Sequence, residues 1–138
     1  MIKNRLQSDK LEKAYGLIHA EVIKHNKHIR EVFLSDGKGI KREYAITFFP
    51  DRVDKTLLQI DKKIKSGGLI GKTFRASGYD IIKRRKKNFI IELPEWLKKE
   101  FLTNKNSAKA SLYEFCVKKG SKALKVYGTI FEIYNPVR

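Results

Sequence analysis

Hydrophobic and polar residues alternate along the first third of the chain in the manner of β-strands. Residues 16–26 and 29–50 carry Ile, Val, Phe, Tyr and Thr at a period of two, and residues 35–39 interrupt the second run with two glycines. Alternation at this period places one face of a strand in the core, and glycines between two such runs supply the backbone of a hairpin turn. The pattern predicts a first strand followed by a hairpin that ends at Pro50.

After Pro50 the spacing of apolar residues changes to that of a helix. Residues 51–65 place Val53, Leu57, Ile60 and Ile64 on one side, and Asp51 is the expected N-cap. We therefore predict one amphipathic helix over 51–65.

The second half of the chain returns to strands around one further helix. A strand-like run over 79–94 ends at Pro94, which suits the first turn of a short helix over 94–102. Two last strands, over 111–119 and 122–134, are joined at Gly120. This order predicts an α+β fold, a single domain over residues 1–138 with an antiparallel sheet.

The charge of the chain is strongly positive, with 31 Lys and Arg against 15 Asp and Glu and a formal net charge of +16. Such a field attracts anions, whether nucleic acid or a small anionic substrate, although lysines spread along the chain also fit solvated strand faces. No membrane span or signal peptide is expected, and the single cysteine, Cys116, is read as a core residue. We expect a cytoplasmic protein.

Residues 66–74, "SGGLIGKTF", come close to a phosphate-binding loop, with Gly71, Lys72 and Thr73 in the required places and Ser66 where the first glycine belongs. A phosphate loop follows a buried parallel strand, whereas residues 57–65 are amphipathic and rich in lysine. Too little chain follows for the rest of a nucleotide-binding sheet. We expect this turn to serve another purpose.

Strand alternation marks two charged residues that point toward the core. Arg30 shares a face with Val32 and Leu34. Under strict alternation, Glu132 shares a face with Leu124, Val126, Gly128 and Ile130. A buried charge needs a partner or a function, and the arginine fork suits a carboxylate. An ion pair for Arg30 and a solvated strand end for Glu132 are the alternative interpretations. A dicarboxylate bound between the two would explain both.

The remaining candidates give weaker signals. Arg84 and Arg85 lie in a basic run where alternation does not decide which one faces inward, and a solvated basic face is the simpler interpretation. His25 and His28 are three residues apart on a strand and have no carboxylate cluster beside them, so no metal site is predicted.

Three segments in order resemble the chorismate lyase family, including its shorter archaeal relatives. Residues 29–50 are similar to the family's "REV-L" strand, acidic-glycine turn and return strand. "GLIGKTFRASGYDIIKRR" resembles its glycine turn between a helix and a strand, with Leu69 in place of proline. Residues 111–136 are similar to the closing hairpin, which ends in a glutamate shortly before a proline. The resemblance covers roughly residues 28–136.

The resemblance implies an antiparallel sheet closed by helices over a buried pocket, and cofactor-free conversion of chorismate to 4-hydroxybenzoate and pyruvate. The carboxylate-binding arginine falls on Arg30, the amide that helps to hold the ligand on Ile70 beside Gly71, and the pocket glutamate on Glu132. The family's second pocket arginine falls on Ile46, and we expect Arg85 to bind substrate in its place. A ligand-sensing module without chemistry, or a basic nucleic-acid-binding module, is the alternative function.

Overall fold

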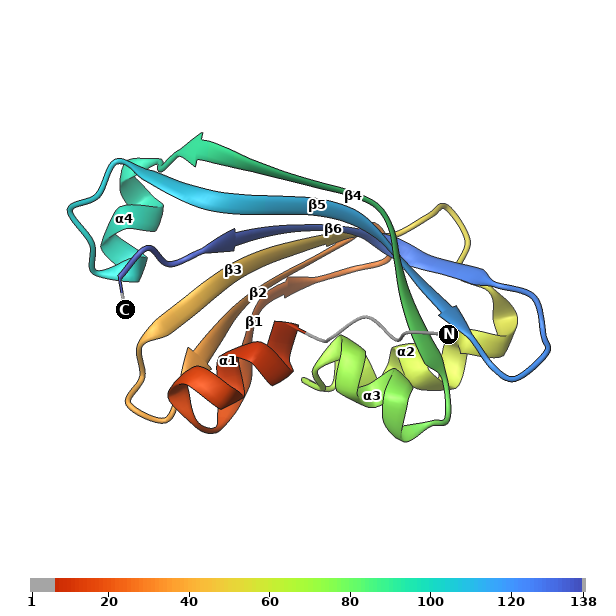
Figure 1. Ribbon diagram of the computed structural model, residues 1–138. Helices are drawn as coiled ribbons and strands as arrows, with labels where there is room; N and C mark the ends of the chain where they lie inside the picture. The colour runs from red at the N-terminus through yellow and green to blue at the C-terminus, as the bar shows by residue number, and fades with distance from the viewer. Residues whose placement is uncertain (1–6, 138) are drawn as a thin grey trace.

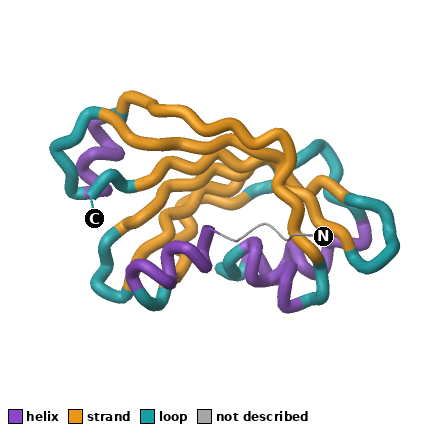
Figure 2. Tube along the Cα trace, in the orientation of Figure 1, coloured by secondary structure: helices purple, strands orange, loops and turns teal. Residues whose placement is uncertain are grey.

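The computed structural model describes residues 7–137, which form one six-stranded sheet with short helices (Figures 1 and 2). The strands lie in the order β1-β2-β3-β6-β5-β4, and every neighbouring pair is antiparallel. Their bounds are β1 Ile18–His25, β2 Ile29–Asp36, β3 Lys41–Phe48, β4 Asp80–Glu92, β5 Ser107–Lys118 and β6 Lys125–Tyr134. The predicted α+β class with an antiparallel sheet is confirmed for the described residues.

Four α-helices accompany the sheet in the described chain: α1 Gln7–Tyr15, α2 Leu58–Lys65, α3 Ile70–Ala76 and α4 Glu95–Phe101. The sheet arches over α1, α2 and α3, and α4 lies at one end of it (Figure 1). In the core, Phe74 of α3 packs against Tyr127, and Leu11 of α1 packs against Val32. Leu97 of α4 packs against residues of β3 and β6 that alternate with those facing α1–α3. We call the face toward α1–α3 the inner face.

The helices differ from expectation at three places. The helix predicted over 51–65 begins later, because a 3-10 turn over Lys55–Leu57 precedes α2, and the capping residue is Asp54 rather than Asp51. Asp54 accepts a hydrogen bond from the Thr56 amide. Part of the Gly-rich stretch, which was expected to be a turn, forms the helix α3. The helix α1 was not predicted from the spacing of apolar residues. The short helix after Pro94 is confirmed.

A bulge in β6 changes which side chains face inward. The β5–β6 register shifts so that Phe115 pairs with Gly128 and Cys116 with Val126, which leaves Tyr127 as an extra residue. Tyr127 is fully buried in the inner core with Ile130. The expectation that Val126 shares the face of Glu132 is therefore wrong, because a bulge reverses the alternation on one side of it.

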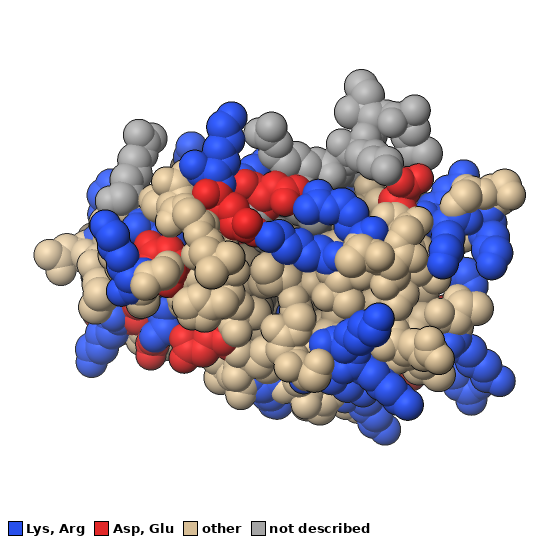
Figure 3. Space-filling model, turned by 90° about the horizontal axis from the view of Figure 1, so that it is seen from below, with Lys and Arg blue, Asp and Glu red and all other residues tan. Residues whose placement is uncertain are grey.

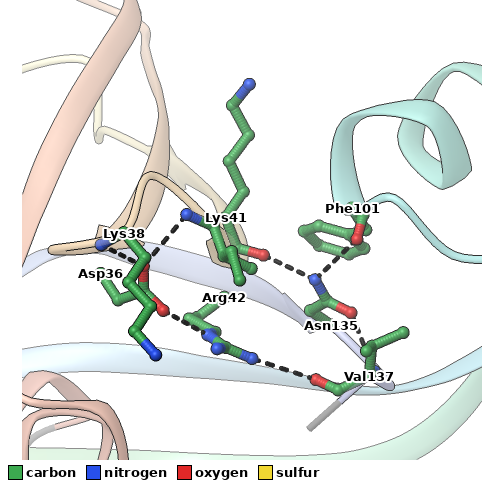
Figure 4. Close-up of polar contacts among 8 residues, drawn as sticks. Asp36, Lys38, Lys41, Arg42, Phe101, Asn135 and Val137 are labelled. Carbon is green, nitrogen blue, oxygen red and sulfur yellow. Dashed lines mark hydrogen bonds and ion pairs between the residues drawn. The ribbon is translucent and has the colours of Figure 1, made fainter.

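A polar cluster fixes the β2–β3 hairpin to the end of the chain (Figure 4). Asp36 accepts hydrogen bonds from the amides of Lys38 and Ile40 and from Arg42 Nε, at 2.9, 3.0 and 2.9 Å. Arg42 also donates to the Val137 carbonyl, and the Asn135 amide donates to the carbonyls of β3 and α4. Burial alone would raise the pKa of Asp36, but these donors, with the Arg42 charge, lower it below its usual value.

Candidate ligand-binding cavity

A cavity of about 70 Å³ lies against the inner face of the sheet, beside the start of α3. That volume is several times the space that one water molecule requires, ~10–15 Å³. Apolar residues such as Val32, Leu34 and Ile130 form much of the wall, and four charged side chains interrupt it: Arg30, Glu43, Lys83 and Glu132. A mostly apolar cavity with a few convergent polar groups is typical of a small-ligand site.

Arg30 enters the cavity from β2 and is only 2% exposed. Its Nη2 donates to the Gly68 carbonyl at 2.8 Å, whereas its buried Nε has no hydrogen-bond partner among the described residues. No carboxylate of the described residues forms a salt bridge with Arg30. Burial lowers the pKa of Arg30, against the opposing influence of Tyr127 and Asp61, but a guanidinium keeps its charge in proteins. The cavity therefore contains a cation with an unused donor.

The turn before α3 holds Arg30 in place. A side chain at Gly68 would put its Cβ 2.8 Å from Thr73 Oγ1 and 3.1 Å from the Lys63 carbonyl, so only glycine fits without displacement. This close turn presents the Gly68 carbonyl to Arg30 and brings Ile70 and Gly71 to the cavity wall. Ile70 and Gly71, which the resemblance to chorismate lyases associates with ligand binding, both line the cavity that Arg30 enters.

Glu132 enters from β6 and is 4% exposed. The Tyr134 hydroxyl lies 3.3 Å from Glu132 Oε1 and 2.8 Å from Ser111 Oγ, and the Tyr113 hydroxyl also hydrogen-bonds to Glu132. Burial, together with the nearby charges of Glu132 and Glu43, raises the pKa values of Tyr113 and Tyr134. Both phenols stay protonated at neutral pH and keep the Glu132 carboxyl group oriented. The alternative interpretation of Glu132 as a solvated strand end is wrong.

Two charged residues of the cavity were not predicted from the sequence. Glu43 of β3 is 1% exposed and lies diagonally across from Glu132, because Ala45 pairs with Glu132 and Glu43 with Tyr134. Lys83 of β4 lines the same cavity, with its Nζ 4.8 Å from the centre of the Tyr113 ring. Burial lowers the pKa of Lys83, while Glu132 and Glu43 oppose that shift. Lys83 lies two residues after the buried Ile81 and therefore on the same face of β4. This spacing could have distinguished Lys83 from the exposed basic residues that follow it.

Arg85, which we expected to bind substrate, does not reach the cavity. Its side chain on the edge strand β4 is 76% exposed and lies 3.6 Å from Glu114 of β5. The backbone bulges between Arg84 and Lys87, and Arg85 has φ 56°, so the alternation that would carry it inward is broken there. Ile46 packs with the α4 cluster on the opposite face, so this position does not face the cavity either.

The residues that imitate a phosphate loop are engaged elsewhere. Lys72 forms an ion pair with Glu12 of α1, and Thr73 Oγ1 donates to the Leu69 carbonyl at 2.7 Å. The segment before the turn is α2 rather than a strand. These contacts occupy the groups that would hold a phosphate and its metal ion.

Comparison with known proteins adds no identification: no protein-family model matches the sequence, and no curated protein matches it. Within residues 7–137, no helix is long and apolar enough to cross a membrane. The same residues contain no group of three or more His, Cys, Asp or Glu side chains placed to hold a metal ion. Cys116 is fully buried.

Proposed function

We propose that the cavity binds chorismate and converts it to 4-hydroxybenzoate and pyruvate. The observation that supports this function is the convergence of four residues that lie far apart in the sequence. Arg30, Ile70, Gly71 and Glu132 were each associated with ligand binding by the resemblance to chorismate lyases, and all four line one cavity.

The positions of the two charged groups suit the reaction. Arg30 would hold the ring carboxylate through its free Nε, since a charged donor in a dry site binds an anion strongly. Glu132, held by Tyr113 and Tyr134, would lie by the ether oxygen that leaves the ring. The net positive charge of the protein would attract the dianion from solution.

The proposed chemistry is an elimination with one acid–base group. The bond between the ring carbon and the ether oxygen breaks, the electron pair leaves with the oxygen, and Glu132 gives that oxygen a proton. The neighbouring ring carbon, which carries the hydroxyl group, loses its proton to the same carboxylate, and the ring becomes aromatic. Enolpyruvate then tautomerises to pyruvate. Because aromatisation drives the reaction, the protein chiefly has to orient the substrate and exclude water.

Incubation of the purified protein with chorismate tests the proposal. The expected result is 4-hydroxybenzoate and pyruvate in equal amounts, at a rate far above the spontaneous decay of chorismate in the same buffer. Binding of 4-hydroxybenzoate without turnover would favour a ligand-sensing module. Neither binding nor turnover by a folded preparation would contradict both functions.

Basic side chains offer less support for a nucleic-acid function. On the face that carries α1–α3, Lys and Arg side chains surround a largely uncharged centre and have acidic side chains among them (Figure 3). Proteins that track a nucleic-acid backbone usually gather their basic residues in one stripe or groove.

A further inference from the structure

Lys83 is a second cation of the cavity, half-buried, that none of the roles described above explains. Its ammonium group packs on the Tyr113 ring and forms no salt bridge with a carboxylate of the described residues. A lysine turned inward from an edge strand gives up hydration that it could keep by pointing outward, as its neighbours do. This arrangement needs a compensating interaction.

The two glutamates of the cavity do not supply a complete one. Glu43 and Glu132 favour the charged form of Lys83 from a distance, but Glu132 is already held by two tyrosine hydroxyl groups. The Lys83 ammonium group has three donors and cannot accept, and the Tyr113 ring provides only a cation–π contact. An acid group bound beside Tyr113 would complete its coordination.

Lys83 and Arg30 belong to opposite ends of the cavity. Arg30 is on β2 and Lys83 on β4, and the strands β3, β6 and β5 lie between them. At a strand spacing of about 4.8 Å the two strands are roughly 19 Å apart across the sheet, and both long side chains line the cavity. Two acid groups on opposite sides of a small ring would therefore suit this pair of cations better than a single carboxylate.

We propose that Lys83 forms a subsite for the second acid group of a dianionic ligand, with Arg30 holding the first. This assignment rests on the proposed function, in which the second group is the carboxylate of the enolpyruvyl side chain. It makes Lys83 a specificity-determining residue: the cavity should prefer a ring with two separated carboxylates over the same ring with one.

Two stable ligands that differ by one carboxylate test the subsite. 3-Methoxybenzoate carries the ring carboxylate alone, and 3-(carboxymethoxy)benzoate adds a second one on the ether substituent. Titration calorimetry on the wild type should show tighter binding of the dianion by about tenfold or more, the usual range for a hydrogen bond to a charged group. Lys83→Met should lose most of that preference and bind the monoanion as the wild type does.

A matched control separates the subsite from general charge. Arg85→Met removes one positive charge from the same strand at an exposed position, and should leave both dissociation constants within about twofold of the wild type, as expected for a screened surface charge. Lys83→Arg, which keeps the charge, should retain a preference for the dianion. If Lys83→Met does not fold, Lys83→Gln replaces it in the same comparison.

The outcomes distinguish this inference from the lyase itself. An equal preference for the dianion in the wild type and in Lys83→Met, or no preference in the wild type, overturns the subsite even if chorismate is converted. A preference that depends on Lys83 supports the subsite even if no 4-hydroxybenzoate forms, in which case the lyase function alone fails.

Discussion

Replacing Arg30 with methionine separates a functional cation from a structural one, because the two roles predict stability changes of different size and opposite outcomes for ligand binding. The side chain is 2% exposed, has an unpaired Nε among the described residues and donates a hydrogen bond to the Gly68 carbonyl. Methionine has a similar length and removes the buried charge. We expect ligand binding to fall strongly while the fold is retained.

The magnitude follows from two opposing contributions. Loss of a hydrogen bond that involves a charged group costs about 1.5–3 kcal/mol. Removal of a buried charge without an ion-pair partner recovers a desolvation cost of several kcal/mol, which is the same order. The free energy of unfolding should therefore change by no more than about 1–2 kcal/mol in either direction. For a chain of 138 residues this corresponds to a melting temperature within roughly 10 °C of the wild type.

Three measurements on Arg30→Met check this reasoning. Urea unfolding gives the stability change, and calorimetry with 4-hydroxybenzoate should show binding weakened by about tenfold or more. Burial first, and then the Arg30 charge, lower the pKa of His25, so its imidazole should titrate at a higher pH in the variant. A loss of 3–5 kcal/mol with ligand binding intact would refute the reasoning, because that pattern belongs to a broken structural ion pair.

Three further variants test separate parts of the account. Glu132→Gln should lower chorismate turnover by ~10²-fold or more, with little change in melting temperature, because it removes only the titrating proton; undiminished turnover ends the assignment. Asp36→Asn should lower the free energy of unfolding at pH 7. The pKa of Asp36 is lowered in the folded protein, so its carboxylate stabilises the fold above the unfolded-state pKa near 3.9 and loses that contribution as it is protonated. The difference in unfolding free energy between variant and wild type should therefore shrink below about pH 4. A gap that is the same at pH 7 and pH 3 in urea unfolding contradicts this. Gly68→Ala forces its Cβ against Thr73 Oγ1 and should weaken 4-hydroxybenzoate binding by displacing the carbonyl that holds Arg30; calorimetry that shows wild-type affinity argues against that role.

The sequence predicted the sheet well because the strands carry their signal locally. Alternation identified the strands and placed Arg30 with Val32 and Leu34, all of which line the cavity. Helices were harder to predict. The first helix has no wide apolar stripe, and the seven residues of α3 lie inside a stretch whose glycines suggested a turn.

Two of the errors at the candidate site have the same physical cause. A bulge adds a residue and exchanges the two faces of a strand beyond it, and it leaves no reliable mark in the sequence. The bulge at Arg85 turns this side chain, which was expected to bind the substrate, away from the cavity. The bulge at Tyr127 moves Val126 to the other face of the sheet. Glu43 was missed because its burial depends on β6 and on the segment before α3, which lie far from it in the sequence.

The central claim, a carboxylate bound at Arg30 and near Glu132, is tested most directly by NMR of the ¹⁵N-labelled protein during titration with 4-hydroxybenzoate. The account predicts a shift of the Arg30 Nε–H signal together with the backbone amides of Ile70 and Gly71, all saturating with one dissociation constant. The exposed basic residues of β4, Arg84 and Arg85 among them, should not move. Shifts confined to that exposed strand, with the Arg30 signal unchanged at saturation, would contradict the claim.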